Sequence, residues 1–241
     1  MLKVTIVIPV LNEEKNIEIL TNKIFKVLKN YVFEIIFVDD NSFDSSEKIL
    51  NKLKKKISNF DFIIRRNEQR DLFQSCVLGV KKSKYKYILI MDGDLQHNPK
   101  YIPIMIKRLF LKKADIVVGA RDFKENNNNS LTLLRLTSSK IIRFFIFILF
   151  GKKTMDPLSG YFLFKKEIFI KNKNNFYGAG FKILSDIIYN VNNLLIFDVI
   201  IKFDRRRFGN SKMNLKIFMQ IIYFFIFCFF RKVFNVYFRI K

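Results

Sequence analysis

Short apolar runs alternate with segments of helical periodicity along the first half of the chain. The apolar runs predict strands at residues 3–9, 33–38, 60–64, 85–91 and 114–119. Between them, apolar residues at helical spacing predict helices over residues 17–28, 44–53, 71–80 and 99–111. Asn12 is available as N-cap of the first helix and Asp44 as N-cap of the second. This alternation predicts an α/β fold with a mostly parallel central sheet.

The second half follows a polar break at residues 124–130 and has a different texture. Residues 131–150 are predicted to be helical, and their end, 144–150, is apolar on every face. Beyond this helix we expect a strand over 154–165, a helix near 181–190 and a strand near 195–203. The pattern divides the chain into a domain of residues 1–212 and a basic, hydrophobic tail of residues 213–241.

The tail has no acidic residue and carries a nearly continuous apolar run at residues 217–230. As a helix this run would be about 21 Å long, whereas a bilayer crossing needs about 20 apolar residues. We therefore expect a C-terminal hydrophobic helix that lies in the membrane interface. The alternatives are a core helix docked on the domain and a short tilted span that extends to Phe238.

The chain is strongly basic, with a formal net charge of +23. This charge indicates a membrane surface, a nucleic acid or a phosphorylated substrate as partner, unless it reflects a general enrichment in Lys, Asn, Ile and Phe. No recognisable RNA or DNA motif accompanies it, so we expect no nucleic-acid partner. Cys76 and Cys228 form no metal or redox spacing and are expected to be buried free thiols. The N-terminus shows no signal-peptide pattern, which favours a cytosolic catalytic part.

Acidic residues gather where three of the predicted strands end. Glu13 follows the first strand, Asp39 and Asp40 end the second, and Asp92 and Asp94 follow the fourth. The carboxyl ends of parallel strands open on one edge of a sheet, where clustered carboxylates need a cation or hydrogen-bond donors from a ligand. Hard carboxylate oxygens suit Mg²⁺ or Mn²⁺. The pattern therefore predicts an enzyme that binds a nucleotide diphosphate.

Six motifs carry a resemblance to a known family. Three are IPVLNE at 8–13, VDDNS at 38–42 and MDGDLQH at 91–97. The others are DPLSGYF at 156–162, GFKIL at 180–184 and FDRRRFGNSK at 203–212. Together they resemble the inverting nucleotide-sugar glycosyltransferases with the GT-A fold, and within them the polyprenol (dolichol) phosphate mannosyltransferases. The first three motifs are shared across the superfamily, and the last three are specific to the polyprenol-phosphate branch.

The resemblance implies roles for the residues at the strand ends. Asp92, Asp94 and Gln96 are the expected metal or diphosphate contacts. The expected nucleotide-binding residues are Pro9, Leu11, Asn12, Glu13, Asp39, Asp40 and Asp92. The chain departs from the family at three places: Leu11 replaces an aromatic residue often found against the base, residues 71–73 (DLF) replace a Gly-Leu-Gly turn, and Asn210 replaces an acidic residue.

A phosphate acceptor is favoured on chemical grounds. A hydroxyl acceptor needs a general base, whereas a phosphate monoester, with a second pKa of about 6, is already largely ionised at pH 7. Processive polysaccharide synthases of this fold carry a Gln-x-x-Arg-Trp segment, and this chain has no Trp. Arginine suits phosphate because its planar group binds with two prongs. The candidate acceptor-phosphate residues are Arg121, Arg135, Ser139, Arg206 and Lys212.

The expected activity is an in-line, inverting transfer of a sugar, with mannose from GDP-mannose favoured, to a polyprenyl phosphate. Asp94 and Arg121 are the candidate catalytic residues, and Mg²⁺ or Mn²⁺ is the expected cofactor. We expect a peripheral or monotopic protein at the cytoplasmic face of the membrane. Alternatives are the same fold acting on glucose or an aminosugar, or on a soluble acceptor, and a non-catalytic basic membrane-binding module. The single histidine, His97, is expected to have a structural role rather than to act as ligand or base.

Overall fold

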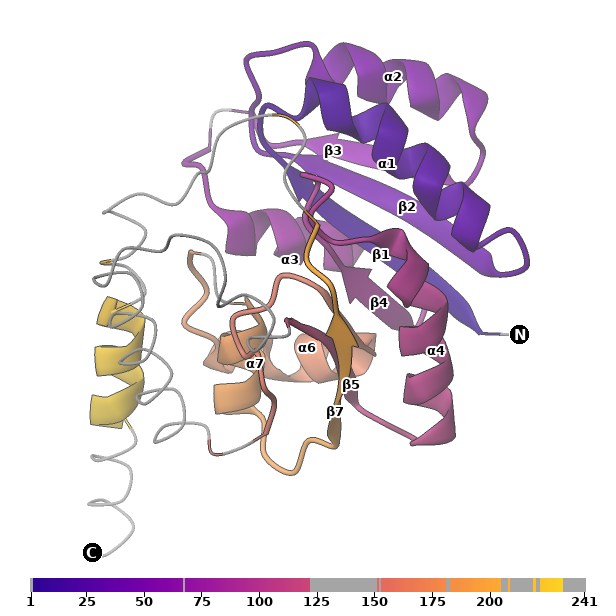
Figure 1. The fold of residues 1–241 in the computed structure, drawn as a ribbon. Helices are drawn as coiled ribbons and strands as arrows, with labels where there is room; N and C mark the ends of the chain where they lie inside the picture. The colour runs from indigo at the N-terminus through magenta and orange to yellow at the C-terminus, as the bar shows by residue number, and fades with distance from the viewer. Residues whose placement is uncertain are drawn as a thin grey trace, which may run out of the picture.

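The structure is a computed structural model and describes residues 2–66, 68–121, 151, 153–180, 183–204, 208, 219 and 222–231. Within these residues the centre is a seven-stranded sheet with strand order β3-β2-β1-β4-β6-β5-β7 (Figure 1). Its strands are β1 (Lys3–Val10), β2 (Val32–Asp39), β3 (Phe60–Ile64), β4 (Tyr87–Ile90), β5 (Ile116–Arg121), β6 (Phe162–Lys165) and β7 (Ile196–Ile201). β6 runs antiparallel to β4 and β5, and the other paired strands are parallel. The α/β fold with a mostly parallel sheet is therefore confirmed.

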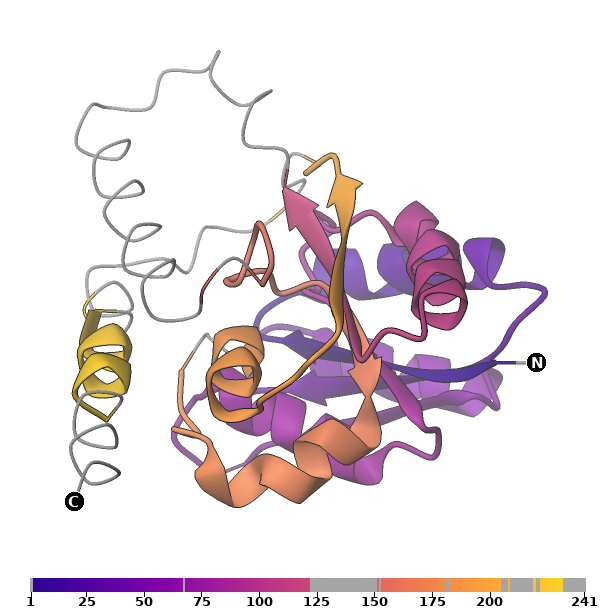
Figure 2. The same cartoon turned by 90° about the horizontal axis from the view of Figure 1, so that it is seen from below.

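Helices cover both faces of this sheet (Figures 1 and 2). They are α1 (Glu14–Val27), α2 (Ser46–Lys56), α3 (Leu72–Lys82), α4 (Ile102–Leu111), α6 (Lys166–Asn172) and α7 (Ile183–Asn190). Short 3₁₀ turns lie at Pro99–Tyr101 and Lys173–Asn175. The apolar side chains of α1, α2 and α4 pack in one core cluster, and those of α3, α6 and α7 pack in another.

β1 shows why the strands of this sheet read as unbroken apolar runs. Ile6 and Ile8 belong to the cluster under α1, whereas Val7 faces α3 on the other side. Successive side chains of a strand point to opposite faces, so a strand covered on both faces is apolar at nearly every position. Apart from the exposed Lys3 at its start, the polar residue of β1 is Thr5, which is buried and donates from its Oγ1 to Glu34 Oε1 at 2.6 Å. This double coverage leaves the ends of the strands as the place where polar groups gather.

Two sequence expectations about helix starts need correction. Asn12 is not the N-cap of α1, because that position is taken by Glu13 and Asn12 has a positive φ of 54°. The Asn12 Oδ1 instead accepts from the backbone N–H of Phe43 at 2.8 Å. For α2 the capping residue is Ser45, although the Asp44 Oδ1 accepts from the first helical N–H, that of Ser46, at 3.0 Å.

The region around β6 also differs from expectation. A strand over 154–165 is wrong, because only Phe162–Lys165 is extended and paired. The sequence reasoning missed α6, which follows β6 directly. The predicted break at 124–130, the helix at 131–150 and the boundary between residues 212 and 213 lie outside the described residues.

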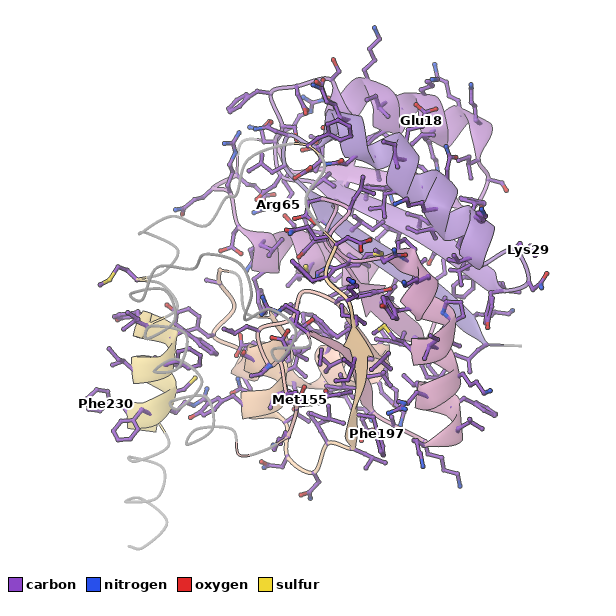
Figure 3. The ribbon with its side chains drawn as sticks, viewed as in Figure 1. Glu18, Lys29, Arg65, Met155, Phe197 and Phe230 are labelled. Carbon is purple, nitrogen blue, oxygen red and sulfur yellow. The ribbon has the colours of Figure 1, made fainter. Side chains whose placement is uncertain are left out.

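Residues 222–231 form a helix that docks one face on the domain. Phe224, Phe225 and Cys228 are buried in the cluster that contains α7, and the Tyr189 hydroxyl donates to the Cys228 carbonyl at 2.8 Å. The opposite face is exposed, and Phe230 points away from the domain (Figure 3). Among the helices that the structure describes, none is long and apolar enough to cross a membrane. The membrane-interface prediction stays a prediction.

Candidate active site

The three acidic strand ends lie side by side, as predicted. β1 is paired with β2 on one side and β4 on the other. Beyond the strands, the Asp40 backbone N–H donates to the Val10 carbonyl at 2.9 Å, and that of Met91 donates to the Val7 carbonyl at 3.2 Å. Pro9 lies at the same edge and lines a cavity next to Asp92. The pairing therefore gathers carboxylates from distant parts of the sequence at one edge.

Asp39 ties the first two loops of this edge together. Its Oδ1 accepts from the Ser42 backbone N–H at 2.8 Å and from the Ser42 hydroxyl at 2.6 Å. The Ser42 Oγ in turn accepts from the Asn12 N–H at 2.8 Å. Burial raises the pKa of Asp39, and the Ser42 hydrogen bonds oppose that rise. A buried carboxylate of raised pKa at a loop edge gains from a ligand that donates a hydrogen bond to it.

Glu13 is buried beside the first turn of α1. Its Oε2 accepts from the Asn16 side-chain amide at 2.6 Å, and its backbone N–H donates to the Ser46 hydroxyl at 3.2 Å. These bonds link the starts of α1 and α2. Glu13 therefore helps to hold the loop after β1 in place.

Asp40 forms a buried ion pair that the sequence analysis did not find. Its partner is Arg65, whose side chain is only 2% exposed. Arg65 also donates to the Asp71 carbonyl at 3.0 Å and pairs with Glu68 at 2.8 Å. Burial raises the pKa of Asp40, and the charge of Arg65 opposes that rise. The position of Arg65, directly after β3, was the signal available in the sequence.

Asp71 anchors the segment 71–73, where the resemblance implies a Gly-Leu-Gly turn. It is the N-cap of α3, and its Oδ1 accepts from the Gln74 N–H at 3.0 Å. Its Oδ2 accepts from the Gly180 N–H at 2.8 Å, and its own N–H donates to Asp40 Oδ2 at 2.8 Å. The Asp71 carboxylate thus joins the start of α3 to the segment before α7, and the Asp71 backbone N–H joins it to Asp40.

Asp92 and its neighbours form the loop after β4. The Asp92 N–H donates to His97 Nδ1 at 3.2 Å, and the buried His97 ring stacks on Tyr161 at 5.0 Å between centroids. The Asp94 Oδ1 accepts from the Gln96 N–H at 3.1 Å, and the Asp94 side chain is buried. The Asp92 side chain is 38% exposed. His97 therefore holds the backbone of the loop, which fits its expected structural role.

Arg121 is held by a carboxylate from the later part of the chain. Its Nε donates to Asp156 Oδ2 at 2.7 Å and its Nη2 to Asp156 Oδ1 at 3.0 Å. Burial lowers the pKa of Arg121, and the bonds to Asp156 more than offset this, so its net shift is upward. The charge of Asp92 adds to that upward shift. Arg121 is thus a fixed cation at the edge where the acidic strand ends meet. Its partner Asp156 was not predicted from the sequence.

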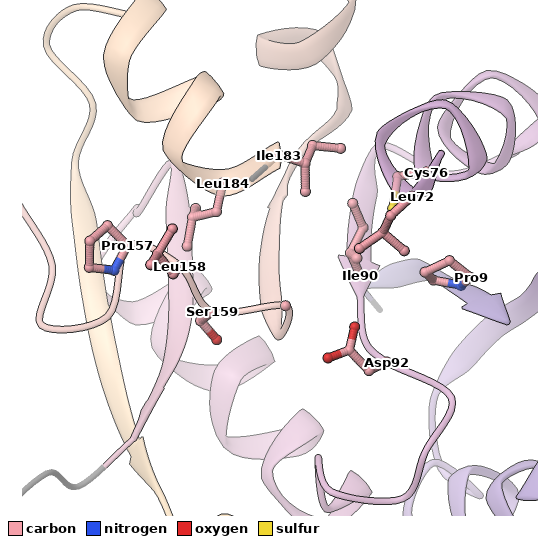
Figure 4. A pocket seen from close by; sticks show the side chains of 11 residues that line it. Pro9, Leu72, Cys76, Ile90, Asp92, Pro157, Leu158, Ser159, Ile183 and Leu184 are labelled. Carbon is pink, nitrogen blue, oxygen red and sulfur yellow. The ribbon is translucent and has the colours of Figure 1, made fainter. Parts of the chain in front are cut away.

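A small cavity separates the Asp92 loop from the segment after Asp156 (Figure 4). Its volume is about 20 Å³, room for about one water molecule. It is lined by Pro9, Leu72, Cys76, Ile90, Asp92, Pro157, Leu158, Ser159, Gly160, Ile183 and Leu184. Asp92 is the charged residue of this lining, and the cavity is too small for a hexose. A ligand larger than water would therefore reach Asp92 from its solvent-exposed side.

The segment after β7 returns to the same edge. The Asp204 N–H donates to the Gln96 carbonyl at 3.0 Å, and Asp204 Oδ2 accepts from the Asn98 side chain at 2.9 Å. Further on, the Lys15 ammonium lies 5.9 Å from the centroid of the Phe208 ring. Phe208 therefore lies near the start of α1. Four predicted acceptor residues lie outside the described residues: Arg135, Ser139, Arg206 and Lys212.

The donor set at this edge suits a divalent cation only in part. Within the ranges that the structure describes, no group of three or more His, Cys, Asp or Glu side chains is arranged to hold a metal. Asp92 and Asp94 supply two carboxylates. Mg²⁺ is commonly bound through one or two carboxylates together with substrate phosphates and water. The residues fit an ion that a diphosphate completes.

The family model for glycosyl transferase family 2 matches residues 5–172 of this chain. The chain belongs to glycosyl transferase family 2. This family 2 chain is 30% identical over 223 residues to a dolichol-phosphate mannosyltransferase of Pyrococcus furiosus, covering 89% of the chain and 60% of the relative. It is 29% identical over 191 residues to a dolichol-phosphate mannosyltransferase of Mycosarcoma maydis, covering 78% of the chain and 64% of the relative. It thus spans less than two thirds of the length of either relative.

Solved structures share the GT-A fold of this family 2 chain. Mannosyl-3-phosphoglycerate synthase from Rubrobacter xylanophilus superposes with a TM-score of 0.71 at 15% identity, covering 97% of this chain and 74% of that one. Glucosyl-3-phosphoglycerate synthase from Mycobacterium tuberculosis, in complex with UDP, superposes with a TM-score of 0.70 at 16% identity, covering 94% and 79%. A further structure of the latter enzyme contains Mn²⁺ and UDP. At these identities the likeness establishes the fold.

Proposed function

We propose that this protein transfers a hexose, with mannose favoured, from a nucleoside diphosphate sugar to a polyprenyl phosphate at the cytoplasmic face of a membrane. One observation carries the proposal: three acidic strand ends and the fixed cation Arg121 meet at one edge of a GT-A sheet. The similarity to two dolichol-phosphate mannosyltransferases supports mannose and a polyprenyl phosphate. GDP-mannose is the favoured donor.

In this proposal, some residues of the edge bind the donor diphosphate and others bind the acceptor phosphate. Asp92, Asp94 and Gln96 would hold Mg²⁺ or Mn²⁺ together with the donor diphosphate, and the ion would neutralise the charge of the departing group. Arg121 would bind a phosphate oxygen, because Asp156 fixes the orientation of its guanidinium. The acceptor phosphate needs no general base, since it is already ionised at pH 7. The proposal assigns the same phosphate-binding role to Arg135, Ser139, Arg206 and Lys212.

The membrane part of the proposal is supported by the helix at residues 222–231. Its exposed face carries large apolar side chains: Tyr223, Ile226, Phe227, Phe229 and Phe230. An exposed apolar face of this kind is a common feature of helices that lie in a membrane interface. The net charge of +23 would add attraction to anionic headgroups. A lipid-linked acceptor requires an active site close to such a surface.

A lipid-extraction assay tests this proposal. The purified protein is incubated with Mn²⁺, vesicles containing a polyprenyl phosphate, and labelled GDP-mannose, UDP-glucose or a UDP-aminosugar. We expect label in the organic phase with GDP-mannose and none when the polyprenyl phosphate is omitted. Label transferred from a different donor would mean that the transferred sugar is not mannose. Label only in a water-soluble product would replace the lipid acceptor, and the absence of any product would favour a non-catalytic membrane-binding module.

Gly160→Ala is expected to impair transfer without unfolding the protein. An added Cβ at Gly160 would lie 2.7 Å from Asp92 Oδ1 and 2.8 Å from Oδ2, well inside normal contact distance. Asp92 would therefore have to move. Misplacement of an active-site group by about 1 Å can cost up to about 10²-fold in rate. Initial rates in the lipid-extraction assay measure the loss, and circular dichroism checks the fold.

The matched control for Gly160→Ala removes the carboxylate that it displaces. In an Asp92→Ala background, the further change Gly160→Ala should lower the rate no more than Asp92→Ala does alone, because the clashing oxygens are gone. If the rate losses of the two substitutions are fully additive, Gly160→Ala does not impair transfer by displacing Asp92.

A further inference from the structure

Phe43 is the most exposed large hydrophobic residue in the part of the chain that the structure describes. Its relative exposure is 81%, compared with 67% for Phe110, the next in order. A phenylalanine this exposed contributes little to folding, since apolar burial is what a large aromatic side chain supplies to a core. Its placement therefore calls for a reason outside the hydrophobic core.

The ring is nevertheless held at a defined place. The Phe43 backbone N–H donates to Asn12 Oδ1 at 2.8 Å, which ties it to the loop after β1. The guanidinium carbon of Arg70 lies 4.3 Å from the centroid of the Phe43 ring. Arg70 is itself fixed, because its Nη2 donates to the Asn41 carbonyl at 2.8 Å. A cation this close to an aromatic ring is in the range of an attractive cation–π contact.

The position of this pair connects it to the candidate active site. Phe43 directly follows Ser42, whose backbone N–H and hydroxyl both donate to Asp39 Oδ1. Asp39 ends β2, at the edge where the acidic strand ends meet. Leu11, which directly follows β1 at the same edge, is aliphatic and offers no aromatic surface. Phe43 thus supplies an aromatic surface on the loop whose Ser42 bonds to Asp39, a carboxylate whose pKa is raised by burial.

We propose that Phe43, supported by Arg70, is the surface on which the nucleobase of the sugar donor stacks. The inference rests on the proposed function, since it assumes a nucleoside diphosphate donor. A nucleobase is a flat π system that can stack on Phe43, and guanine or uracil can at the same time donate its ring N–H to Asp39. Stacking on an aromatic side chain tolerates any base, and the carboxylate favours bases that present an N–H at their edge.

Binding measurements with and without a base test the inference. Calorimetry with Mn²⁺ compares GDP, UDP and inorganic pyrophosphate on the wild-type chain and on Phe43→Ala. Because base–aromatic stacking contributes strongly to binding, Phe43→Ala should weaken the preferred nucleotide about tenfold to a hundredfold. Pyrophosphate, which has no base, should bind with unchanged affinity. Phe43→Trp should retain nucleotide binding.

The matched control is Phe110→Ala, which removes an exposed phenylalanine of α4. It should change neither nucleotide nor pyrophosphate affinity. Unchanged nucleotide binding by Phe43→Ala would overturn the inference, as would an equal loss for pyrophosphate, which would indicate damage to the diphosphate site. A wild-type chain that binds neither nucleotide would overturn the proposed function as well.

Discussion

Asp94→Asn is expected to lower sugar transfer by about 10²- to 10³-fold, the loss typical when a group that stabilises transition-state charge is removed. Asparagine keeps the shape of the side chain and an oxygen that can accept from the Gln96 N–H, 3.1 Å away. It loses the negative charge that a divalent cation requires. We therefore expect a folded protein that binds membranes normally but transfers poorly.

Two measurements separate this outcome from general damage. The Mn²⁺ electron paramagnetic resonance signal, titrated in the presence of GDP, should show weaker Mn²⁺ binding by the variant. Asp115→Asn is the matched control, because Asp115 pairs with Lys165 at 2.6 Å and precedes β5, at the edge opposite the acidic strand ends. This control should transfer at the wild-type rate. Normal transfer by Asp94→Asn would show that the metal assignment is wrong.

The first half of the fold could be predicted because its signals are local. β1, β2 and β3 are covered on both faces or nearly so, and their apolar runs end at the residues where the sheet ends. Parallel pairing then places the strand ends together whatever the details of the loops. These two facts alone were enough to predict that Asp39, Asp40 and Asp92 lie at one edge of the sheet.

The contacts that complete the site could not be predicted, because they join residues far apart in the sequence. Arg65 meets Asp40 across 25 positions, and Asp156 meets Arg121 across 35. No periodicity marks such pairs, and each residue read singly is an ordinary surface charge. The contact of Gly160 with Asp92 is equally hidden, since a glycine between Ser159 and Tyr161 reads as a turn residue.

β6 and Asn12 show two other limits. The β6 segment is only four residues long, and it runs antiparallel to both neighbours. Pattern alone does not give the direction of so short a strand. Asn12 was a sound N-cap candidate by residue type, but Glu13 takes the cap, because Asn12 adopts a positive φ and bonds to the loop that carries Phe43. A tertiary contact overrode the local preference in this case.

Arg65→Met is expected to lower the free energy of unfolding by about 3–5 kcal/mol at pH 7, the cost of leaving a buried charge without its partner. Arg65 is 2% exposed and Asp40 10% exposed at the side chain, so solvent cannot replace the lost contact. Methionine has a similar length and is uncharged. Figure 3 labels Arg65. Urea denaturation of the wild-type chain and of Arg65→Met, followed by circular dichroism, measures the difference in the free energy of unfolding.

The neighbouring residue provides the control for this prediction. Arg66 pairs with Glu47 at the surface, where the two side chains are 60% and 43% exposed. Exposed pairs contribute about 0–1 kcal/mol, so Arg66→Met should leave the unfolding midpoint nearly unchanged. Equal losses for the two variants would mean that burial of the pair is not the cause.

The pH dependence identifies the charge responsible. Burial raises the folded-state pKa of Asp40 above the ordinary value of 3.8, so the folded state favours the protonated carboxyl. Stability from such a group is fully present below pH 3.8 and is lost as pH rises through the folded-state pKa. Without Arg65 to oppose burial, that pKa rises further, and the loss of stability in Arg65→Met should grow between acid and neutral pH.

Adding Asp40→Asn removes the buried charge, so the double variant should recover much of the lost stability and lose this pH dependence. A loss that is constant with pH, or that Asp40→Asn fails to reduce, would place the role of Arg65 in its bonds to the Asp71 carbonyl and Glu68 instead.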